Sequence, residues 1–276
     1  LGELLALDFN RVQFTPDLMP GDILGTNILQ ENENGHRDMV FRQGPVFTNI
    51  MLADEINRAS PKTQAAMLEA MQEAAVTLLG ETRKLPFPFF VLASQNPIEM
   101  EGTYPIPEAQ LDRFMFKLQV NTVDSNTICE IISKRRRGEA PAPSWKMNAE
   151  DLQRIFEVMD RIYLPKAVAE YISRLVAGSH PGNAHAISVT GDYVAYGASP
   201  RAAIAMAEAA RAAALLAGRP TVGFDDVRKV APAVLNHRLI MNYKARMDNV
   251  NSFDVIDRLL SETEVAGFDM PAGVAV

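Results

Sequence analysis

The amino-acid sequence predicts an α/β protein, with a parallel sheet core followed by a smaller helical domain. In the first half, nearly continuous apolar runs, typical of strands buried on both faces of a sheet, alternate with segments of helical periodicity. A Pro- and Gly-rich linker follows at 135–145. Beyond it only helical patterns recur, including the Ala-rich stretch 201–217. We therefore place the α/β domain at 1–140 and the helical domain at 141–276.

The α/β half is predicted to begin with a strand and a long hairpin. The run FNRVQF (9–14) indicates a short strand, and a stretch rich in proline and glycine follows it. Two β-like pieces around the polar tip QENENGHRD indicate a hairpin within 26–46. The run TNIMLA (48–53) then has the apolar character of a strand buried in a parallel sheet.

A helix and a second hairpin come next. Ser60 is suited to cap a helix whose first residue is Pro61, because a proline there loses no hydrogen bond. VTLLGETRKLPF indicates a hairpin within 76–88 that turns at Gly80. The remaining predicted elements are strands at 89–94 and 115–120, and helices at 107–116 and at about 124–137, 149–160, 165–178, 199–217 and 224–236.

Composition and charge limit the class of protein. The chain has 276 residues, of which 47% are apolar, enough for a sizeable core in two domains. Its net charge of −7 argues against a sequence-independent nucleic-acid binder, which usually shows a basic footprint. The basic run KRRR (134–137) is more simply a solvated helix end than a nucleic-acid contact. No apolar run reaches the length of a membrane span.

The cysteine and histidines suggest neither a disulfide nor a metal site. Cys129 is the single cysteine, so no internal disulfide can form, and this suits the reducing cytoplasm. We expect Cys129 in the apolar face of a helix, as part of the core. The four histidines, His36, His180, His185 and His237, show no metal-ligand spacing.

The strongest chemical signal follows the apolar run 48–53. Asp54 and Glu55 come directly after it, and ligands of parallel sheets bind beyond the carboxyl ends of the strands. One acid can hold Mg²⁺ through its water shell, because magnesium prefers oxygen ligands and keeps several waters. The second can deprotonate a water that attacks a phosphate. Seen alone, an Asp-Glu pair after a strand is more often a polar loop or a helix start.

Three further residues fit phosphate chemistry. Asn96 ends the neighbouring strand, where an amide can orient a water. Arg113 and Arg201 carry planar, permanently charged groups suited to phosphate oxygens. Each residue also has a purely structural explanation, a turn for Asn96 and a surface helix position for Arg201. For Arg113 that explanation is an ion pair with Asp112 or Glu108.

In their order along the chain these motifs resemble the MoxR family of AAA+ ATPases. IMLADEINRASPKTQAAMLEAMQE is similar to the Walker B segment and the helix after it, and VLASQNPIEMEGTYPIPEAQLDRFMF is similar to the sensor 1 and arginine-finger region. GASPRA corresponds to sensor 2, and RVQFTPDLMPGDILG and FRQGPVF also match family patterns. The resemblance extends to about residue 240. It implies an AAA+ P-loop NTPase-type sheet core with a small all-helical lid domain.

The resemblance also implies roles for the candidate residues. Asp54 would be the Mg²⁺-associated Walker B acid, Glu55 the catalytic base and Asn96 the sensor 1 residue. Arg113 would be a finger that reaches the nucleotide of a neighbouring subunit, and Arg201 the sensor 2 residue. ATP and Mg²⁺ would be the cofactors, and the protein would form a homo-oligomer, a hexameric ring with ATP at the subunit interfaces.

The implied activity is ATP hydrolysis coupled to chaperone-like remodelling or maturation of partner proteins, which often carry von Willebrand factor A domains. The hairpin at 26–46 resembles the insert in helix 2 of this clade, and the hairpin at 76–88 resembles the one before sensor 1. Such hairpins often face a central pore or a partner. Arg58 has two interpretations, a residue facing a neighbouring nucleotide or a surface residue at a helix start.

The chain departs from the family pattern at one motif. The phosphate-binding loop GxxxxGK[ST] is absent, although LGELLALDFNRVQF resembles the segment just after that loop in the family, so we expect the loop upstream of Leu1. Two alternatives stay open. One is a non-hydrolysing interaction scaffold, supported by the missing loop. The other is a helicase or magnesium-chelatase-like motor of the same clade, although the negative net charge disfavours the helicase.

Overall fold

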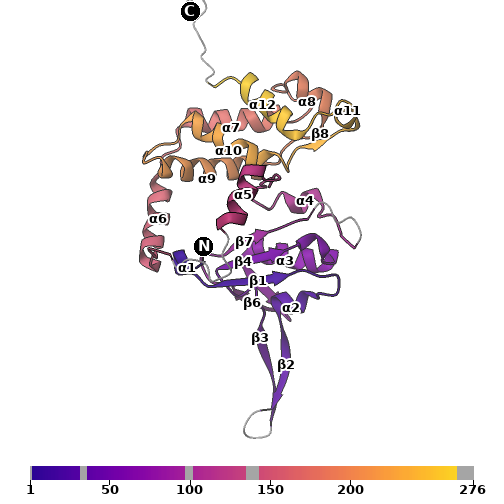
Figure 1. Cartoon of the computed structure of the whole chain (residues 1–276), viewed down its shortest axis with the longest axis vertical. Helices are drawn as coiled ribbons and strands as arrows, with labels where there is room; N and C mark the ends of the chain where they lie inside the picture. The colour runs from indigo at the N-terminus through magenta and orange to yellow at the C-terminus, as the bar shows by residue number, and fades with distance from the viewer. Residues whose placement is uncertain (1, 32–35, 97–101, 135–142, 266–276) are drawn as a thin grey trace, which may run out of the picture. The chain divides into compact units, whose positions relative to one another are not determined.

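The computed structural model of the chain describes residues 2–31, 36–96, 102–134 and 143–265. Its contacts divide the chain into two units (Figure 1): unit 1 comprises residues 1–113 and 143–154, and unit 2 comprises 114–142 and 155–276. This division differs from the predicted boundary after residue 140, because the passage between the units already begins at Phe114.

The segment that follows Arg113 is held by the second unit. Arg238 donates to the backbone carbonyl of Phe114 at 2.7 Å, and Lys117 donates its backbone N–H at 3.0 Å to helix α10 (Phe224–Leu235). The predicted strand at 115–120 is wrong, since no strand is assigned to these described residues. Their hydrogen bonds go to the end of α10 instead of to a neighbouring strand.

A parallel sheet forms the centre of unit 1, as predicted. Its three strands are β1 (Phe9–Gln13), β4 (Ile50–Asp54) and β7 (Phe90–Ala93), in the order β1-β4-β7. The central strand β4 carries the apolar run, which is buried as expected for a strand covered on both faces. All three strands run in the same direction, so their carboxyl ends meet at one edge of the sheet.

Helix α3 (Pro61–Glu73) follows the sheet's central strand and confirms the predicted start. Ser60 is its N-cap, and the Ser60 hydroxyl accepts from the backbone N–H of Thr63 at 3.4 Å. The helix buries Met67 and Leu68 in the core of unit 1. The smaller elements of this unit are α1 (Gly2–Leu5), α2 (Pro20–Leu24), the 3₁₀ helix η1 (Ile56–Arg58) and α4 (Glu108–Leu111).

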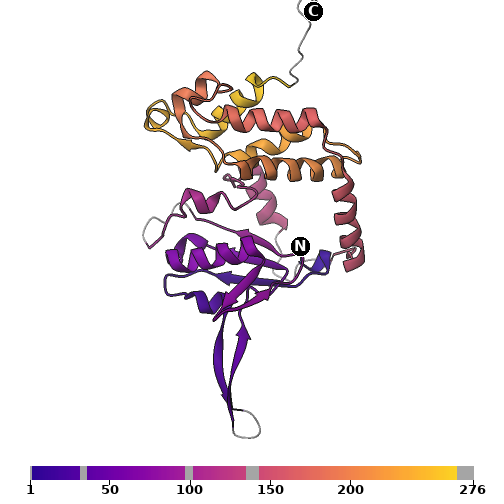
Figure 2. The same ribbon diagram turned by 180° about the vertical axis from the view of Figure 1, so that it is seen from behind.

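Both predicted hairpins are present in unit 1. The first pairs β2 (Gly25–Glu31) with β3 (Arg37–Gln43), and this ribbon extends away from the sheet in both views (Figures 1 and 2). Gly44 is needed at its base, since a Cβ there would lie 2.2 Å from the carbonyl oxygen of Ile23. The second hairpin pairs β5 (Ala75–Leu78) with β6 (Glu81–Lys84) and turns at Leu79 and Gly80, both with positive φ.

Unit 2 is mainly helical, as predicted. Its helices are α5 (Ser125–Lys134), most of α6 (Ala149–Arg161), α7 (Lys166–Gly178), α8 (Ser188–Tyr193), α9 (Pro200–Leu216), α10, α11 (Tyr243–Met247) and α12 (Ser252–Glu262). A short antiparallel pair, β8 (Val194–Tyr196) with β9 (Ile240–Met241), was not predicted. The core gathers Tyr171, Leu175, Met206, Leu235 and Leu259, all fully buried.

One core prediction is wrong. Cys129 lies on α5 but is exposed, and no residue of α5 is buried, so its apolar stripe is not covered in the structure. No helix among the described residues is long and apolar enough to cross a membrane.

Candidate active site

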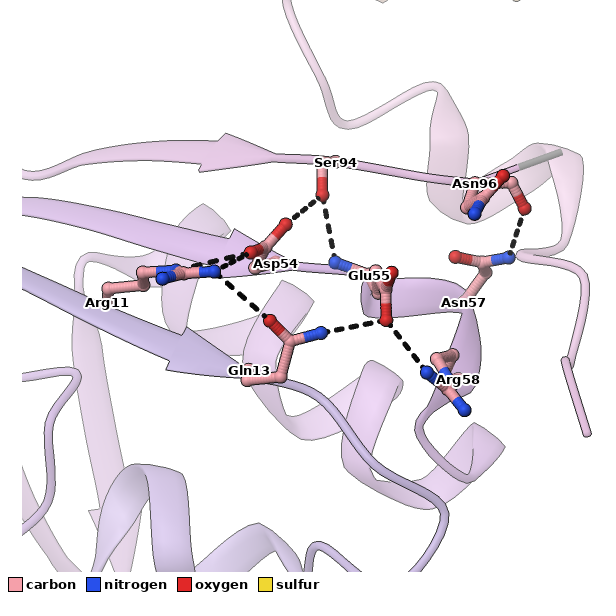
Figure 3. Close-up of polar contacts among 8 residues, drawn as sticks. All are labelled: Arg11, Gln13, Asp54, Glu55, Asn57, Arg58, Ser94 and Asn96. Carbon is pink, nitrogen blue, oxygen red and sulfur yellow. Dashed lines mark hydrogen bonds and ion pairs between the residues drawn. The ribbon is translucent and has the colours of Figure 1, made fainter. Parts of the chain in front are cut away.

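Asp54 ends the central strand and is held on both of its carboxylate oxygens (Figure 3). The Ser94 hydroxyl donates to Oδ1 at 2.5 Å, and Arg11 donates to Oδ2 from Nη2 at 2.5 Å and from Nε at 3.2 Å. The Ser94 hydrogen bond, followed by the Arg11 guanidinium, lowers the pKa of Asp54 below its ordinary range. Asp54 is therefore ionised at neutral pH.

Glu55 leaves the strand in a left-handed conformation, with φ of 54° and ψ of 48°. Only a few per cent of non-glycine residues adopt positive φ, and such strain tends to gather at functional sites. The Glu55 N–H donates to the Ser94 hydroxyl at 2.9 Å. Glu55 Oε2 accepts from Gln13 Nε2 at 2.7 Å and from Arg58 Nη1 at 3.0 Å (Figure 3). Both acids are thus fixed by side chains of their own unit.

These hydrogen bonds form a closed cycle. Arg11 Nη2 also donates to Gln13 Oε1 at 3.4 Å, so a continuous path of hydrogen bonds links Ser94, Asp54, Arg11, Gln13 and Glu55 and returns to Ser94. We call these five residues the carboxylate network. A network in which each member is bonded restrains the side chains more than isolated pairs do. Three strands contribute to it, since Ser94 directly follows β7.

Sequence reasoning did not find Arg11, Gln13 or Ser94. Arg11 and Gln13 are two apart on β1 and therefore point to one face, and Gln13 lies opposite Asp54 in the sheet register. The available signal was the alternation of polar residues toward the end of that strand. The interpretation of Arg58 as a plain surface residue is incomplete, since it forms an ion pair with Glu55 at 3.0 Å.

Asn96 lies beside the network. Figure 3 places it next to Asn57, whose Nδ2 donates to the Asn96 carbonyl oxygen at 3.3 Å. The buried Gln64 side chain supports this region by donating to the carbonyls of Ile56, Ala59 and Tyr104. The structure thus brings Asn96 to the edge where Asp54 ends its strand.

Arg113 is found elsewhere in unit 1, in a pocket of about 370 Å³ between α3 and the end of α4. Its Nε is buried and has no hydrogen-bond partner among the described residues. The alternative ion pairs with Asp112 or Glu108 do not form within the described part of the chain. Within the described residues, Arg113 Nε is therefore a buried donor without an acceptor.

Arg201 belongs to unit 2 and is the second residue of α9. Ser199 caps this helix and accepts from the Arg201 backbone N–H at 3.2 Å. The Arg201 side chain is exposed at the helix N-terminus, where the helix dipole also favours an anion.

The oxygen atoms of Asp54 and Ser94 fit Mg²⁺, which keeps several water ligands, better than a metal whose ligands all come from side chains. No group of three or more His, Cys, Asp or Glu side chains that could hold a metal occurs in the described ranges. Asp54 and Ser94 nevertheless offer oxygen atoms, and one ionised carboxylate with waters and phosphate oxygens is a usual magnesium environment.

Comparisons with known proteins cover both units. The profile of the "ATPase family associated with various cellular activities (AAA)" matches residues 1–116, and that of the "AAA lid domain" matches residues 187–259. Chaperone MoxR1 of Mycobacterium tuberculosis is 43% identical over 253 residues, which are 91% of this chain. The uncharacterised protein YeaC of Bacillus subtilis is 38% identical over 276 residues, covering 96% of this chain.

A solved structure agrees with these relatives. The crystal structure of a protein provisionally described as an ATPase, from Cytophaga hutchinsonii, superposes with a TM-score of 0.86 at 37% identity and covers 95% of this chain. The chain spans 66% of the M. tuberculosis protein, 79% of the B. subtilis protein and 79% of the C. hutchinsonii chain.

Proposed function

Because the chain belongs to the MoxR family of AAA+ ATPases, we propose that it couples ATP hydrolysis to chaperone-like remodelling or maturation of partner proteins. The observation that carries this proposal is the carboxylate network, which fixes two adjacent acids at the carboxyl edge of a parallel sheet. That edge is where ligands of such sheets bind. The name of the M. tuberculosis relative supports the chaperone part.

The two acids have separate roles in this proposal. Asp54 would hold Mg²⁺, which prefers oxygen ligands, and Ser94 keeps the Asp54 carboxylate oriented. When bound, the metal ion neutralises charge on the phosphates. Glu55 accepts the proton of the attacking water, and Gln13 and Arg58 hold its carboxylate in place.

The remaining candidates act on the nucleotide from its other sides. Asn96 orients the attacking water as the sensor 1 residue, and Arg201 contacts phosphate oxygens as the sensor 2 residue. Arg113 reaches the nucleotide of a neighbouring subunit, so the working form is a homo-oligomer, proposed to be a hexameric ring. Its Nε, which has no hydrogen-bond partner among the described residues, supports this role.

We also propose the setting in which the ATPase works. Its client is a protein of the von Willebrand factor A type, reached through the β2–β3 hairpin, and its compartment is the cytoplasm. A ring-forming motor uses hydrolysis in each subunit to displace such a partner. The family resemblance supports this setting.

The proposal is tested by Glu55→Gln in the full-length protein. We expect ATP binding to persist and hydrolysis to fall roughly 10²- to 10³-fold, because the amide keeps the shape but cannot take a proton. Binding is measured by titration calorimetry and hydrolysis by phosphate release. Glu157→Gln, an exposed acid on α6, is the matched control and should hydrolyse ATP normally.

Two results would contradict the proposal. Wild-type turnover in Glu55→Gln would remove Glu55 from the base role. Absence of both ATP binding and hydrolysis in the unmodified full-length protein would favour the non-hydrolysing scaffold.

A further inference from the structure

The end of α10 is hydrogen-bonded to the segment that directly follows Arg113, and both parts belong to unit 2. The backbone N–H of Lys117 donates to the carbonyl of Ala233 in the last turn of α10 at 3.0 Å. The Asn236 side chain, at the C-cap of α10, donates to the carbonyl of Lys117 at 2.9 Å. The last carbonyls of a helix need partners from outside the helix, and this segment supplies one of them. We call the three residues after α10 the α10 clamp: Asn236, His237 and Arg238.

The residue next to Arg113 receives the most contacts from the α10 clamp. Arg238 Nη2 donates to the carbonyl oxygen of Phe114 at 2.7 Å, and Arg238 Nη1 donates to that of Met115 at 3.2 Å. His237 Nε2 lies 3.1 Å from the Phe114 carbonyl oxygen and donates to it, because a carbonyl can only accept. A carbonyl oxygen has two lone pairs, so the Phe114 carbonyl is fully used by these two side chains.

Burial shows that hydrogen bonds and not side-chain packing hold this segment. His237 and Arg238 are 7% and 6% exposed, and a buried charge is costly unless its donors find acceptors. In contrast, the side chains of Met115, Phe116 and Leu118 are exposed, at 37%, 41% and 76%. The backbone that follows Arg113 is therefore fixed by the α10 clamp, whose planar guanidinium suits two neighbouring carbonyls.

Arg113 itself lies between two anchored peptides. It is the last residue of unit 1 before the chain passes to unit 2, and its backbone N–H donates to the Gln110 carbonyl at 3.2 Å. On its other side, the Phe114 carbonyl is held by the α10 clamp. A functional side chain needs such support, since a misplacement of about 1 Å can cost a large part of the rate.

We propose that His237 and Arg238 are positioning residues for Arg113. By holding the backbone directly after Arg113, they set the direction in which its guanidinium extends. This inference rests on the proposed function of Arg113 as a finger that acts in trans. It makes unit 2 of one subunit a determinant of hydrolysis in the next subunit.

The first test is Arg238→Lys in the full-length protein. Lysine keeps the charge but lacks the planar fork that bonds two carbonyls at once. We expect kcat to fall about 10- to 100-fold, the size expected from a misplaced catalytic group, while KM for ATP stays close to wild type. Arg174→Lys is the matched control, since Arg174 also donates to two consecutive carbonyls of unit 2, those of Glu264 and Val265, at 3.2 and 3.1 Å. It should hydrolyse ATP like wild type.

A pair of substitutions at His237 tests the same contact without changing Arg238. His237→Leu removes the donor to the Phe114 carbonyl, whereas His237→Gln can replace it with an amide N–H. We expect a lower kcat in His237→Leu and its recovery in His237→Gln. Equal kcat values in the two variants, or a rise in KM with kcat unchanged in Arg238→Lys, would overturn the positioning role.

Mixtures of variants separate positioning of the finger from a general defect of the fold. Arg238→Lys subunits keep Glu55 and should regain hydrolysis when Glu55→Gln neighbours supply a well-placed Arg113. Mixing them with Arg113→Ala subunits should restore nothing, because neither partner then supplies such an arginine. Failure of the Glu55→Gln mixture to regain hydrolysis would overturn the inference.

Failure of the proposed finger function has a different signature. In that case Arg113→Ala subunits, which have an unchanged α10 clamp, would also gain nothing from Glu55→Gln neighbours. Recovery of Arg113→Ala without recovery of Arg238→Lys would leave the finger in place and overturn only the role of His237 and Arg238.

Discussion

Asp54 and Arg113, two charged residues of the proposed active site, differ in the hydrogen bonds that they form. Asp54 has both oxygens bonded, to Ser94 and to Arg11, within its own unit. Arg113 has a buried Nε without a partner in the described chain. The sheet register places the acids beside their partners, whereas no hydrogen bond to Arg113 Nε occurs within the described residues. This contrast agrees with the proposal above, in which the acids act within their own subunit and Arg113 acts on the nucleotide of a neighbour.

The largest effect is expected from removing Arg113, the residue whose Nε has no partner in the described chain. Arg113→Ala should lower ATP hydrolysis about 10³-fold, because a finger stabilises charge that develops in the transition state. ATP binding by each subunit should stay close to wild type. The measurement is phosphate release by Arg113→Ala alone and in mixtures of Arg113→Ala with Glu55→Gln subunits.

The mixtures decide where the arginine acts. Arg113→Ala and Glu55→Gln subunits, each nearly inactive alone, should regain hydrolysis when mixed, because an Arg113→Ala subunit keeps Glu55 and can take its arginine from a Glu55→Gln neighbour. Arg154→Ala is a suitable control, since Arg154 is a mostly exposed arginine of unit 1 that pairs with Asp151 at 3.9 Å. Mixtures that stay as inactive as the two separate variants would show that Arg113 acts only within its own subunit.

From the sequence, the two acids at the end of the apolar run could be identified as candidates, but Arg11, Gln13 and Ser94 of the carboxylate network could not. Asp54 and Glu55 were found because an apolar run stops at them, which is a local signal. Arg11 and Ser94 were missed because their importance depends on the β1-β4-β7 register, and register is a tertiary property. The partner of a polar residue near a strand end can be identified only when the register of the strands is known.

Errors in the rest of the fold have the same origin. The pattern at 115–120 is typical of a strand, but a strand needs a paired neighbour, and the backbone near Lys117 bonds to α10. Cys129 lies in an amphipathic helix, yet amphipathicity does not say whether another element covers the stripe. Helix α12 is an exception, because its signal is local: Asn251 caps it and Asp254 completes the capping box, yet the helix was not predicted.

Replacing Arg11 tests how its contact with Asp54 affects the magnesium requirement. Arg11 donates twice to Asp54 Oδ2 and so competes with a cation for that oxygen. Arg11→Ala should therefore lower the Mg²⁺ concentration that gives half-maximal hydrolysis, by about fivefold, the scale of an exposed ion pair. A magnesium titration of phosphate release measures it. Arg37→Ala, on the hairpin and paired with Glu31, is the control and should not shift the titration. A higher magnesium requirement in Arg11→Ala would mean that Arg11 orients Asp54 for the metal.

The smallest expected effect concerns stability and the Ser94 hydroxyl. Since hydrogen bonding to Ser94 is the main cause that lowers the pKa of Asp54 below 3.8, the ionised carboxylate stabilises the fold above about pH 4. This stabilisation is lost as the pH falls through the lowered pKa, because the folded state must then take up a proton.

Ser94→Ala should cost about 1 kcal/mol of unfolding free energy at pH 7. The difference from wild type should shrink below pH 4, in urea unfolding followed by circular dichroism. Ser261→Ala removes a hydroxyl that bonds only a backbone carbonyl, so its effect should not vary with pH. A Ser94→Ala deficit that stays constant down to pH 3 would place the hydroxyl's contribution in packing and not in the charge of Asp54.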